Sequence, residues 1–469
     1  MTKPSGNHKG NLYFIGIAGH TMRGLALAAR ELGFEVTGFD PTAVPPGSDW
    51  LDGQGITWWR EFKNFQLDQV TAVIVTGAHI SDQAPVVVAA RERHIPIKSY
   101  AQLFGELTEG KHVIDVSGTH GKTTTTALIA WLLESAGRHP DFLIGIQPFN
   151  FNSSVRLTGS NVVVAEGDEY RASPLETKSK VQYHHPDTLV LTSVEHDHPD
   201  FFPDLQAVTK RFQDIVAALP KSGRLVAWAE STTVVEVAHS AAAPVTTYGL
   251  GTGDYTARNI AYLPTGIEFD IENHTGPLGR FATMLYGKHN VLNSLAATAA
   301  ALSEGLTIKQ IIAAGATFMG TYRRFNLMNS ADARIVVIDD YGHHPTEVAT
   351  NLEAAKLHFP GRRILAIVRP HTYSRTKALL PQWQHGFGSA DLVYITDIEG
   401  AREAGADHTV SGNDIVQALK MPAIYTPSRN ELIAHVSKDA KPGDVIICFT
   451  VSGYDQLAED LTNLLNPEA

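Results

Sequence analysis

A ten-residue segment, residues 116–125, constrains the fold of this chain more than any other feature. It reads V-S-G-T-H-G-K-T-T-T, follows an apolar run typical of a strand (His112–Val116), and precedes a run typical of a helix (Ala127–Leu133). A glycine-rich turn between a strand and a helix lets backbone N–H groups close around phosphate oxygens. The segment therefore predicts an α/β chain with a phosphate-binding turn.

In such a turn the side chains of Lys122 and Thr123 have distinct tasks. The lysine reaches the outer phosphates, and the threonine hydroxyl ligates Mg²⁺. The first glycine, Gly118, stands two positions later than in the general pattern G-x-x-x-x-G-K-[ST], and a ligand-free strand–helix connection is the alternative. The predicted nucleotide contacts from this turn are Gly118, Thr119, His120, Gly121, Lys122, Thr123 and Thr124.

Length, charge and cysteine content narrow the class of protein. A chain of 469 residues suggests three domains, and a net charge of −11 argues against a nucleic-acid or membrane-surface binder. The only cysteine, Cys448, stands in an apolar run and is expected in a core, so a reducing compartment is indicated. The polar segment Met1–Gly10 has no signal-peptide pattern, and no apolar run is long enough to span a bilayer. These features predict a soluble, cytoplasmic enzyme.

Strands alternate with helices in three blocks, at residues 1–108, 109–325 and 326–469. This rhythm favours parallel sheets covered by helices. We expect a three-domain α/β fold: a Rossmann-like N-terminal domain, a central domain like that of P-loop ATPases with a mostly parallel sheet, and a Rossmann-like C-terminal domain. The main predicted strands are Leu12–Ile17, Glu35–Phe39, Asn161–Ala165, Thr188–Val194, Arg334–Asp339, Arg363–Val368, Leu392–Thr396, Ala423–Thr426 and Val445–Thr450, and a less regular stretch, Arg224–Leu285, leans towards β structure.

The first block carries a second glycine turn. It reads G-I-A-G-H-T-M-R-G from Gly16 to Gly24, and Asp40 follows the next predicted strand. The pattern is similar to a dinucleotide-binding turn, in which a helix N-terminus faces a diphosphate. Ala18 and Thr21 stand where glycines are expected, so nicotinamide binding and a ligand-free turn are both alternatives for this block.

Acidic and histidine residues end two strands of the second block, at Glu166–Glu169 and Glu195–His198. Ligands of open α/β sheets bind at the carboxyl ends of the strands. Glu166 and His198 are suited to hold Mg²⁺, or Mn²⁺ in view of the histidine, against the phosphates of a nucleotide. Taken alone, each acidic cluster is more typical of a solvated loop, and a zinc site is a minor alternative for His184, His185, His196 and His198.

Two further segments are suited to nucleotide chemistry. Gly287–Asn293 begins a predicted helix, where His289, Asn290 and Asn293 could contact adenine or simply cap the helix. Arg324 lies where the second block passes into the third. An arginine there could neutralise a transferring phosphoryl group, although a surface arginine is the simpler interpretation.

In the third block, polar residues follow two successive strands, at Asp339–Glu347 and Arg369–Thr376. Such residues at strand ends can form the wall of a site. Arg375 could bind a carboxylate with two hydrogen bonds, as an amino-acid substrate requires. Thr346 and Glu347 are also suited to cap the following helix.

Taken in order, these motifs resemble those of the Mur ligases of peptidoglycan synthesis, over essentially the whole chain. The matching segments are Gly118–Thr123, Glu166–Glu169, Asp197–His198, Gly287–Asn293, Arg324 and Asp340–Pro345. The resemblance implies an ATP- and Mg²⁺-dependent amide ligase. Such an enzyme activates the lactyl carboxylate of UDP-N-acetylmuramate as an acyl phosphate, which an amine then attacks.

The resemblance also implies roles for residues in this chain. The expected UDP-sugar contacts are Gly16, Ile17, Gly19, Met22 and Asp40; the catalytic residues Lys122, Arg324, His343 and Asp340; the amino-acid contacts Tyr341, His371 and Arg375; and the metal ligands Thr123, Glu166 and His198. His343 or Asp340 would accept the proton of the incoming amine. Nucleic acid and membrane are not among the expected partners.

The motifs indicate the class of enzyme more sharply than they indicate its amine substrate. Pro370–Thr376 is similar to the segment of the family member that adds L-alanine, whereas Thr177–Lys180 is similar to that of the member that adds L-alanyl-γ-D-glutamyl-meso-diaminopimelate. L-alanine is favoured because the third domain of the family binds the amine. Outside this class, the alternatives are a nucleotide-binding regulator or an oxidoreductase that uses the turn of the first block.

Overall fold

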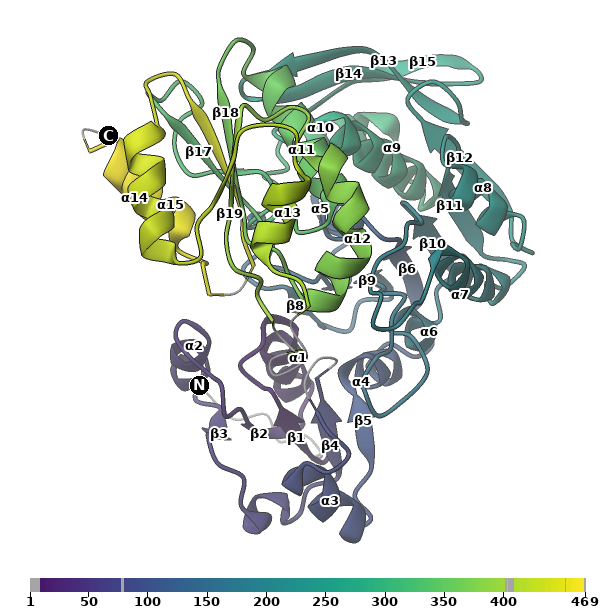
Figure 1. Cartoon of the computed structure of the whole chain (residues 1–469). Helices are drawn as coiled ribbons and strands as arrows, with labels where there is room; N and C mark the ends of the chain where they lie inside the picture. The colour runs from purple at the N-terminus through teal and green to yellow at the C-terminus, as the bar shows by residue number, and fades with distance from the viewer. Residues whose placement is uncertain (1–8, 77–79, 401–402, 404–408, 452, 468–469) are drawn as a thin grey trace. The chain divides into compact units, whose positions relative to one another are not determined.

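The computed structural model describes residues 9–76, 80–400, 403, 409–451 and 453–467. These residues form two compact units. Unit one comprises the chain up to Val194, Thr209–Thr247 and Ala296–Leu306, and unit two comprises Glu195–Val208, Tyr248–Leu295 and the chain from Thr307 onwards. Figure 1 shows the helices and strands of both units.

Unit one begins with a parallel five-stranded sheet in the order β3-β2-β1-β4-β5. Its strands alternate with helices, as the sequence predicts. The elements are β1 (Asn11–Ile15), α1 (His20–Glu31), β2 (Glu35–Phe39), α2 (Gly47–Gly53), β3 (Thr57–Trp59), the 3₁₀ helix η1 (Asn64–Leu67), β4 (Ala72–Val75), α3 (Pro85–Glu92), β5 (Ile97–Ser99) and α4 (Tyr100–Leu107).

The second sheet of unit one has the strand order β11-β10-β6-β9-β7-β8 and is parallel except for the pair β7–β8. Strand β6 therefore lies between β10 and β9, and β9 ends in the predicted site residue Glu166. The elements are β6 (His112–Ser117), α5 (Lys122–Ser135), β7 (Asp141–Leu143), β8 (Val155–Arg156), β9 (Val162–Glu166), α6 (Val181–His184), β10 (Thr188–Leu191), β11 (Arg224–Trp228) and α8 (Thr232–Ala238). Three further elements continue from one unit into the other: α7 (Leu205–Ala217), β12 (Val245–Gly249) and α9 (Lys288–Ser303).

One hydrophobic core joins the two sheets of unit one. Helix α1 packs closely on β8, because a Cβ atom on Gly24 would lie 2.9 Å from Val155 Cγ2. Helix α4 approaches α6 in the same way, since a Cβ atom on Gly105 would lie 2.1 Å from the Tyr183 carbonyl oxygen. These glycines let α1 pack closely on β8 and α4 on α6, within the core that joins the two sheets.

Unit two contains an antiparallel group of β13 (Tyr255–Leu263), β14 (Gly266–Asn273) and β15 (Gly276–Thr283). Its larger sheet has the order β16-β17-β21-β18-β19-β20, parallel apart from β16. The elements are α10 (Ile308–Gly315), β16 (Asn326–Leu327), β17 (Val336–Asp340), α11 (Pro345–His358), β18 (Ile364–Val368), α12 (Tyr373–Gly386), β19 (Leu392–Ile395), α13 (Gly412–Ala418), β20 (Ala423–Tyr425), α14 (Arg429–Asp439), β21 (Val445–Phe449) and α15 (Leu457–Leu465).

Helices cover both faces of this six-stranded sheet. Helices α11, α12 and α13 pack on one face, and α14 and α15 pack on the other (Figure 1). Cys448 is fully buried in β21, as the sequence predicts. The strands read as continuous apolar runs because both faces are covered.

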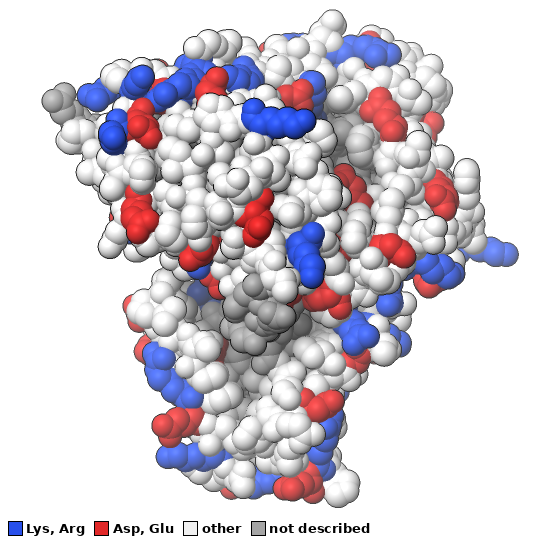
Figure 2. Space-filling model, in the orientation of Figure 1, with Lys and Arg blue, Asp and Glu red and all other residues white. Residues whose placement is uncertain are grey.

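The expected α/β architecture with mostly parallel sheets is confirmed. The main local difference is that α5 begins at Lys122, so that the threonine run belongs to the helix and not to a loop. No helix among the described residues is long and apolar enough to cross a membrane. Acidic and basic side chains are interspersed on the face drawn in Figure 2.

Candidate active site

The turn between β6 and α5 adopts a conformation that only its glycines readily reach. Gly118 has φ 137° and Gly121, the residue that caps α5, has φ 82°. The loop is held from the end of β10: the N–H groups of Thr119 and His120 donate to Ser193 O (2.9 Å) and Ser193 Oγ (2.8 Å). The first turn of α5 then directs its N–H groups out of the helix end, the arrangement that binds phosphate. The sequence did not reveal this role of Ser193.

Lys122 bends back over its own loop. Its Nζ atom lies 2.5 Å from the Gly118 carbonyl oxygen. It is also 3.5 Å from Glu169 Oε2 and 3.6 Å from Asp168 Oδ1. The ammonium group therefore stands at the mouth of the turn and is oriented by groups from two segments of unit one.

Two of the predicted metal ligands are in contact. The Thr123 hydroxyl donates to Glu166 Oε1 at 2.8 Å, and the Gly145 N–H donates to Glu166 Oε2 at 2.7 Å. Burial raises the pKa of Glu166, and the nearby charge of Asp168 adds to this, whereas Lys122 opposes it. A carboxylate in such a place gains from a cation beside it. The third predicted ligand, His198, belongs to unit two.

Asp168 connects two lysines, a feature that the sequence did not indicate. Lys180 Nζ lies 2.6 Å from Asp168 Oδ2 and donates to the Tyr170 hydroxyl at 2.8 Å. Burial alone would raise the pKa of Asp168, but Lys180 and Lys122 outweigh it and hold that pKa well below its usual range. The carboxylate is therefore charged and fixed beside Lys122.

In the first turn, Asp40 holds the backbone. The Ala18 N–H donates to Asp40 Oδ2 at 3.1 Å, and Thr42 donates to Oδ1 from its N–H (3.0 Å) and its hydroxyl (2.9 Å). Gly16 has φ 74°, and Gly19 caps α1. The side chains of Ile17 and Met22 are buried in the core. Of the predicted sugar-nucleotide contacts, the glycines and Asp40 thus set the conformation of the turn. Ile17 and Met22 pack their side chains into the core next to it.

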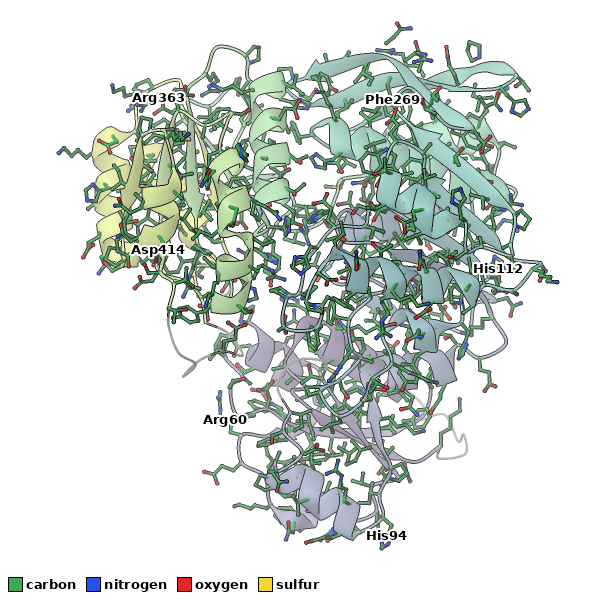
Figure 3. All side chains as sticks on the ribbon, turned by 45° about the vertical axis from the view of Figure 1, so that its right-hand side comes forward. Arg60, His94, His112, Phe269, Arg363 and Asp414 are labelled. Carbon is green, nitrogen blue, oxygen red and sulfur yellow. The ribbon has the colours of Figure 1, made fainter. Side chains whose placement is uncertain are left out.

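Two arginines, Arg23 and Arg60, bring positive charge to the region of this turn, and neither belongs to a motif recognised in the sequence. Arg23 donates to His20 Nδ1 at 2.9 Å and lies over the ring of Trp50, 5.6 Å from its centroid. Arg60 (Figure 3) donates to the Ala43 carbonyl at 2.6 Å. Arginines fixed in this way favour an anionic ligand.

In unit two, the residues expected near adenine bond to one another at the start of α9. Asn290 Nδ2 donates to the Tyr286 carbonyl (2.7 Å) and to His289 Nε2 (3.0 Å). Asn293 Nδ2 donates to Asn290 Oδ1 at 2.9 Å. The three predicted residues therefore form one connected group whose orientation is set by the protein.

The segment around Arg324 is fixed by a buried carboxylate. Asp340 Oδ2 accepts from the Phe325 N–H (2.7 Å) and Oδ1 from the Gly342 N–H (2.6 Å), and burial raises the pKa of Asp340 to about 6. Arg324 lies 3.7 Å from Glu347. Both oxygens of Asp340 are thus engaged with the backbone, which favours a structural role over that of a base. Glu347 also completes the capping box of α11 with His344, so its capping role is confirmed.

His343 is better placed than Asp340 to accept a hydrogen bond from a substrate. Its Nδ1 lies 2.9 Å from the Tyr341 carbonyl oxygen, which can only accept, so Nδ1 carries the hydrogen. Burial, aided by Arg375, lowers the pKa of His343 to about 4. The ring is therefore neutral at neutral pH, and Nε2 is an acceptor. The His343 ring also contacts that of His371, at a centroid distance of 5.2 Å.

Each guanidinium nitrogen of Arg375 has a partner in the protein. It is 3% exposed, and its Nε donates to Asp197 Oδ1 at 2.8 Å. Its two terminal nitrogens donate to His371 Nδ1 (2.9 Å) and His198 Nδ1 (3.3 Å). Burial would raise the pKa of Asp197, but His198 and Arg375 hold it well below its usual range. Residues from two predicted motifs thus meet around one guanidinium group.

Comparison with known proteins gives the same assignment as the motifs. Three family profiles match: the Mur ligase family catalytic domain at residues 11–112, the Mur ligase middle domain at residues 116–301, and the glutamate ligase domain of Mur ligases at residues 323–450. A protein named UDP-N-acetylmuramate–L-alanine ligase, from Desulfitobacterium hafniense (strain Y51), is 34% identical over 459 residues, 96% of this chain and 99% of the relative.

Two solved structures are also similar. The UDP-N-acetylmuramate–alanine ligase of Thermotoga maritima superposes with a TM-score of 0.78 at 23% identity, covering 98% of this chain and 100% of that one. The UDP-N-acetylmuramate:L-alanyl-γ-D-glutamyl-meso-diaminopimelate ligase of Neisseria meningitides has a TM-score of 0.62 at 34% identity, covering 67% of this chain and 99% of that one. The resemblance expected from the motifs is confirmed, and the chain belongs to the Mur ligase family of ATP-dependent ligases.

Proposed function

We propose that the chain joins the lactyl carboxylate of UDP-N-acetylmuramate to the amine of L-alanine with ATP, in the synthesis of a peptidoglycan precursor. The observation that carries this proposal is the contact between the Thr123 hydroxyl and Glu166, beside Lys122 at the start of α5. A hydroxyl and a carboxylate are oxygen donors, which suit Mg²⁺. The pair therefore fits the metal of a magnesium nucleotide, with Mn²⁺ as the alternative ion.

The first step would activate the acid. A carboxylate oxygen attacks the γ-phosphorus of ATP, the bond to the β-phosphate oxygen breaks, and an acyl phosphate and ADP result. Lys122 and the N–H groups of α5 stabilise the negative charge on the phosphoryl group in transfer. Mg²⁺ held by Thr123 and Glu166, with His198 as a further candidate, would neutralise part of the same charge. Arg324 is our candidate for a second cation at the transferred group.

The second step would form the amide. The uncharged amine attacks the carbonyl carbon of the acyl phosphate, and phosphate leaves from the tetrahedral intermediate. Carboxylates do not react with amines directly, which is the chemical reason for ATP. The neutral Nε2 of His343 is suited to accept a hydrogen bond from the attacking amine, and Tyr341, His371 and Arg375 are our candidates for binding the amino acid.

We assign these tasks to three domains. Residues 1–108 would bind the UDP sugar at the turn of Gly16, Gly19 and Asp40, residues 109–325 would bind ATP, with His289, Asn290 and Asn293 near adenine, and residues 326–469 would bind the amine. Use of ATP together with a single, buried cysteine supports a cytoplasmic location.

A second amine donor, L-alanyl-γ-D-glutamyl-meso-diaminopimelate, is supported by one specific finding. The Neisseria relative whose name states this tripeptide is 34% identical to the chain. Two-substrate kinetics would decide between the donors: ADP release is measured with UDP-N-acetylmuramate and either L-alanine or the tripeptide, and kcat/KM is compared. A higher value for the tripeptide would refute L-alanine as the donor. No amine-dependent ADP release with either donor would refute the ligase function, and Lys122→Ala serves as the inactive control.

A further inference from the structure

Two buried side chains beneath the phosphate loop form a pair that the proposed chemistry does not use. Asp115 lies on β6 and His184 ends α6, and neither side chain has any exposed surface. Asp115 Oδ2 is 2.6 Å from His184 Nδ1. Apolar residues of similar volume often stabilise a protein as well as a buried charged pair does, so the pair is poorly explained by stability alone.

The other oxygen of Asp115 lies against Gly167. Among the described residues, Asp115 Oδ1 has no hydrogen-bond partner. A Cβ atom on Gly167 would lie 2.1 Å from this oxygen and 2.8 Å from Val181 Cβ. Real Cβ atoms do not approach other heavy atoms so closely, so only a residue without a side chain fits beside Asp115. The position of the Asp115 carboxylate therefore requires a glycine at residue 167.

Strand β6 holds Gly167 by its backbone as well. The Gly167 N–H donates to the Val116 carbonyl at 3.0 Å, and the Ser117 hydroxyl donates to the Gly167 carbonyl at 2.6 Å. Val116 and Ser117 thus bind the N–H and the C=O of Gly167, and Asp115 occupies the space that a side chain at this residue would need. His184 in turn fixes Asp115, and its ring packs edge-on against Phe104 of α4 at a centroid distance of 5.1 Å.

The residues on either side of Gly167 belong to the candidate ATP site. Glu166 accepts the hydrogen bond of Thr123, and Asp168 lies beside Lys122. A displacement of the Gly167 backbone would therefore move both carboxylates, since they are its immediate neighbours in the chain.

We propose that Asp115, His184 and Gly167 form a positioning clamp that sets where Glu166 and Asp168 stand and thereby tunes the affinity for magnesium ATP. That the ligand of this site is magnesium ATP rests on the proposed function. Outer residues that orient metal ligands typically change affinity 10–100-fold when they are replaced. The three residues are positioning residues, because they touch neither the metal ligand atoms nor the phosphate loop lysine.

The test measures binding directly, by titrating the purified full-length chain with ATP in the presence of Mg²⁺. Asp115→Ala, and His184→Phe, which keeps a ring against Phe104, should each weaken binding about 10–100-fold. Asp115→Asn keeps the shape of the side chain and should bind nearly as the wild type does. If Asp115→Ala does not fold, His184→Phe carries the test.

Asp141→Ala is the matched control for lost stability. Asp141 is also fully buried, and it accepts hydrogen bonds from Lys111 (2.7 Å) and the Thr158 N–H (2.6 Å). It pairs in register with Val163, three residues before Glu166, and so lies away from the carboxyl end of the sheet. This variant should lower the melting temperature and leave the affinity for magnesium ATP unchanged.

A double replacement tests the mutual dependence of the clamp. Gly167→Ala should strongly weaken the binding of magnesium ATP in the wild-type chain, and much less in the Asp115→Ala background. The second replacement removes the clash of the new Cβ atom with Asp115 Oδ1. It also removes the contact with His184 that holds α6, so that Val181 can move away from the new Cβ atom. Equal effects of Gly167→Ala in both backgrounds, or wild-type affinity in folded Asp115→Ala and His184→Phe, would overturn the clamp. A wild-type chain that binds magnesium ATP but never ligates an amine would overturn the proposed function instead, and would leave the clamp in place.

Discussion

Replacing Gly118 by alanine should open the phosphate loop. Its φ of 137° lies in a region that only glycine occupies readily, at a cost of about 1–3 kcal/mol for alanine. The new Cβ atom would also lie 2.2 Å from Thr192 Oγ1 and 2.8 Å from the Ser193 nitrogen, so the Thr192 hydroxyl must leave. The single O–H of Thr192, shared between the His120 carbonyl (2.5 Å) and the Ser117 carbonyl (3.2 Å), would lose this hydrogen bonding, worth about 1 kcal/mol. The sum of the backbone and hydrogen-bond costs is about 3 kcal/mol.

Gly137→Ala is the matched control, because Gly137 follows the other end of the same helix. It also has a positive φ, 76°, but a Cβ atom there would meet nothing within 4 Å. The expected cost is about 1–2 kcal/mol. Thermal unfolding should therefore show a clearly larger loss for Gly118→Ala, at about 2–4 °C per kcal/mol for domains of 150–250 residues. Calorimetric titration should show that only Gly118→Ala loses affinity for ATP. Equal losses of stability, or unchanged ATP binding by Gly118→Ala, would refute the reasoning.

Three further variants test other parts of the site. Thr123→Val removes the hydroxyl that donates to Glu166 and should weaken ATP binding in the presence of Mg²⁺ by about tenfold. The affinity for ATP measured with EDTA should change little. An equal loss of affinity in both conditions would contradict a role of Thr123 as a metal ligand. The pKa of His343 is about 4 in the folded chain and about 6.5 in the unfolded chain, so the native protein gains stability as the pH rises from 4 towards 6.5. His343→Gln removes this titration and should flatten the pH dependence of the melting temperature. A melting temperature that rises with pH as steeply as in the wild type would contradict this. Arg375→Ala removes the arginine that donates to the buried Asp197 and should cost about 3–5 kcal/mol. The additional replacement Asp197→Ala in the same chain should partly restore this stability. Unchanged stability with only a raised KM for the amino acid would identify Arg375 as a substrate contact alone.

Much of the fold was predictable because its signals are local. Strand β2 has the predicted bounds, β6 and β18 differ from prediction by one residue at one end, and β9 is shifted by one residue at both ends. Both glycine turns stand between a strand and a helix, as expected. Parallel strands covered on both faces produce long apolar runs, which are easily recognised. The antiparallel group β13–β15 appeared in the sequence only as a less regular stretch that leans towards β structure, since its half-exposed strands lack such runs.

The candidate site was predictable only in part. The contact of Thr123 with Glu166 joins two motifs that the sequence identified, 43 residues apart. By contrast, the lysine that holds Asp168 and the serine that holds the phosphate loop carry no pattern of their own. Their roles exist only because Lys180 and Ser193 are brought to the ends of neighbouring strands.

The sequence by itself determined which segments turn, extend or coil, and which short motifs have the chemistry of a nucleotide-dependent ligase. These properties depend on backbone conformation and on side-chain periodicity over a few residues. The tertiary structure decided which side chain meets which: Arg375 with Asp197, 178 residues away, and Asp115 with His184 and Gly167. Such pairings follow from the order of strands in a sheet and from the packing of helices on it, and no local pattern encodes that order.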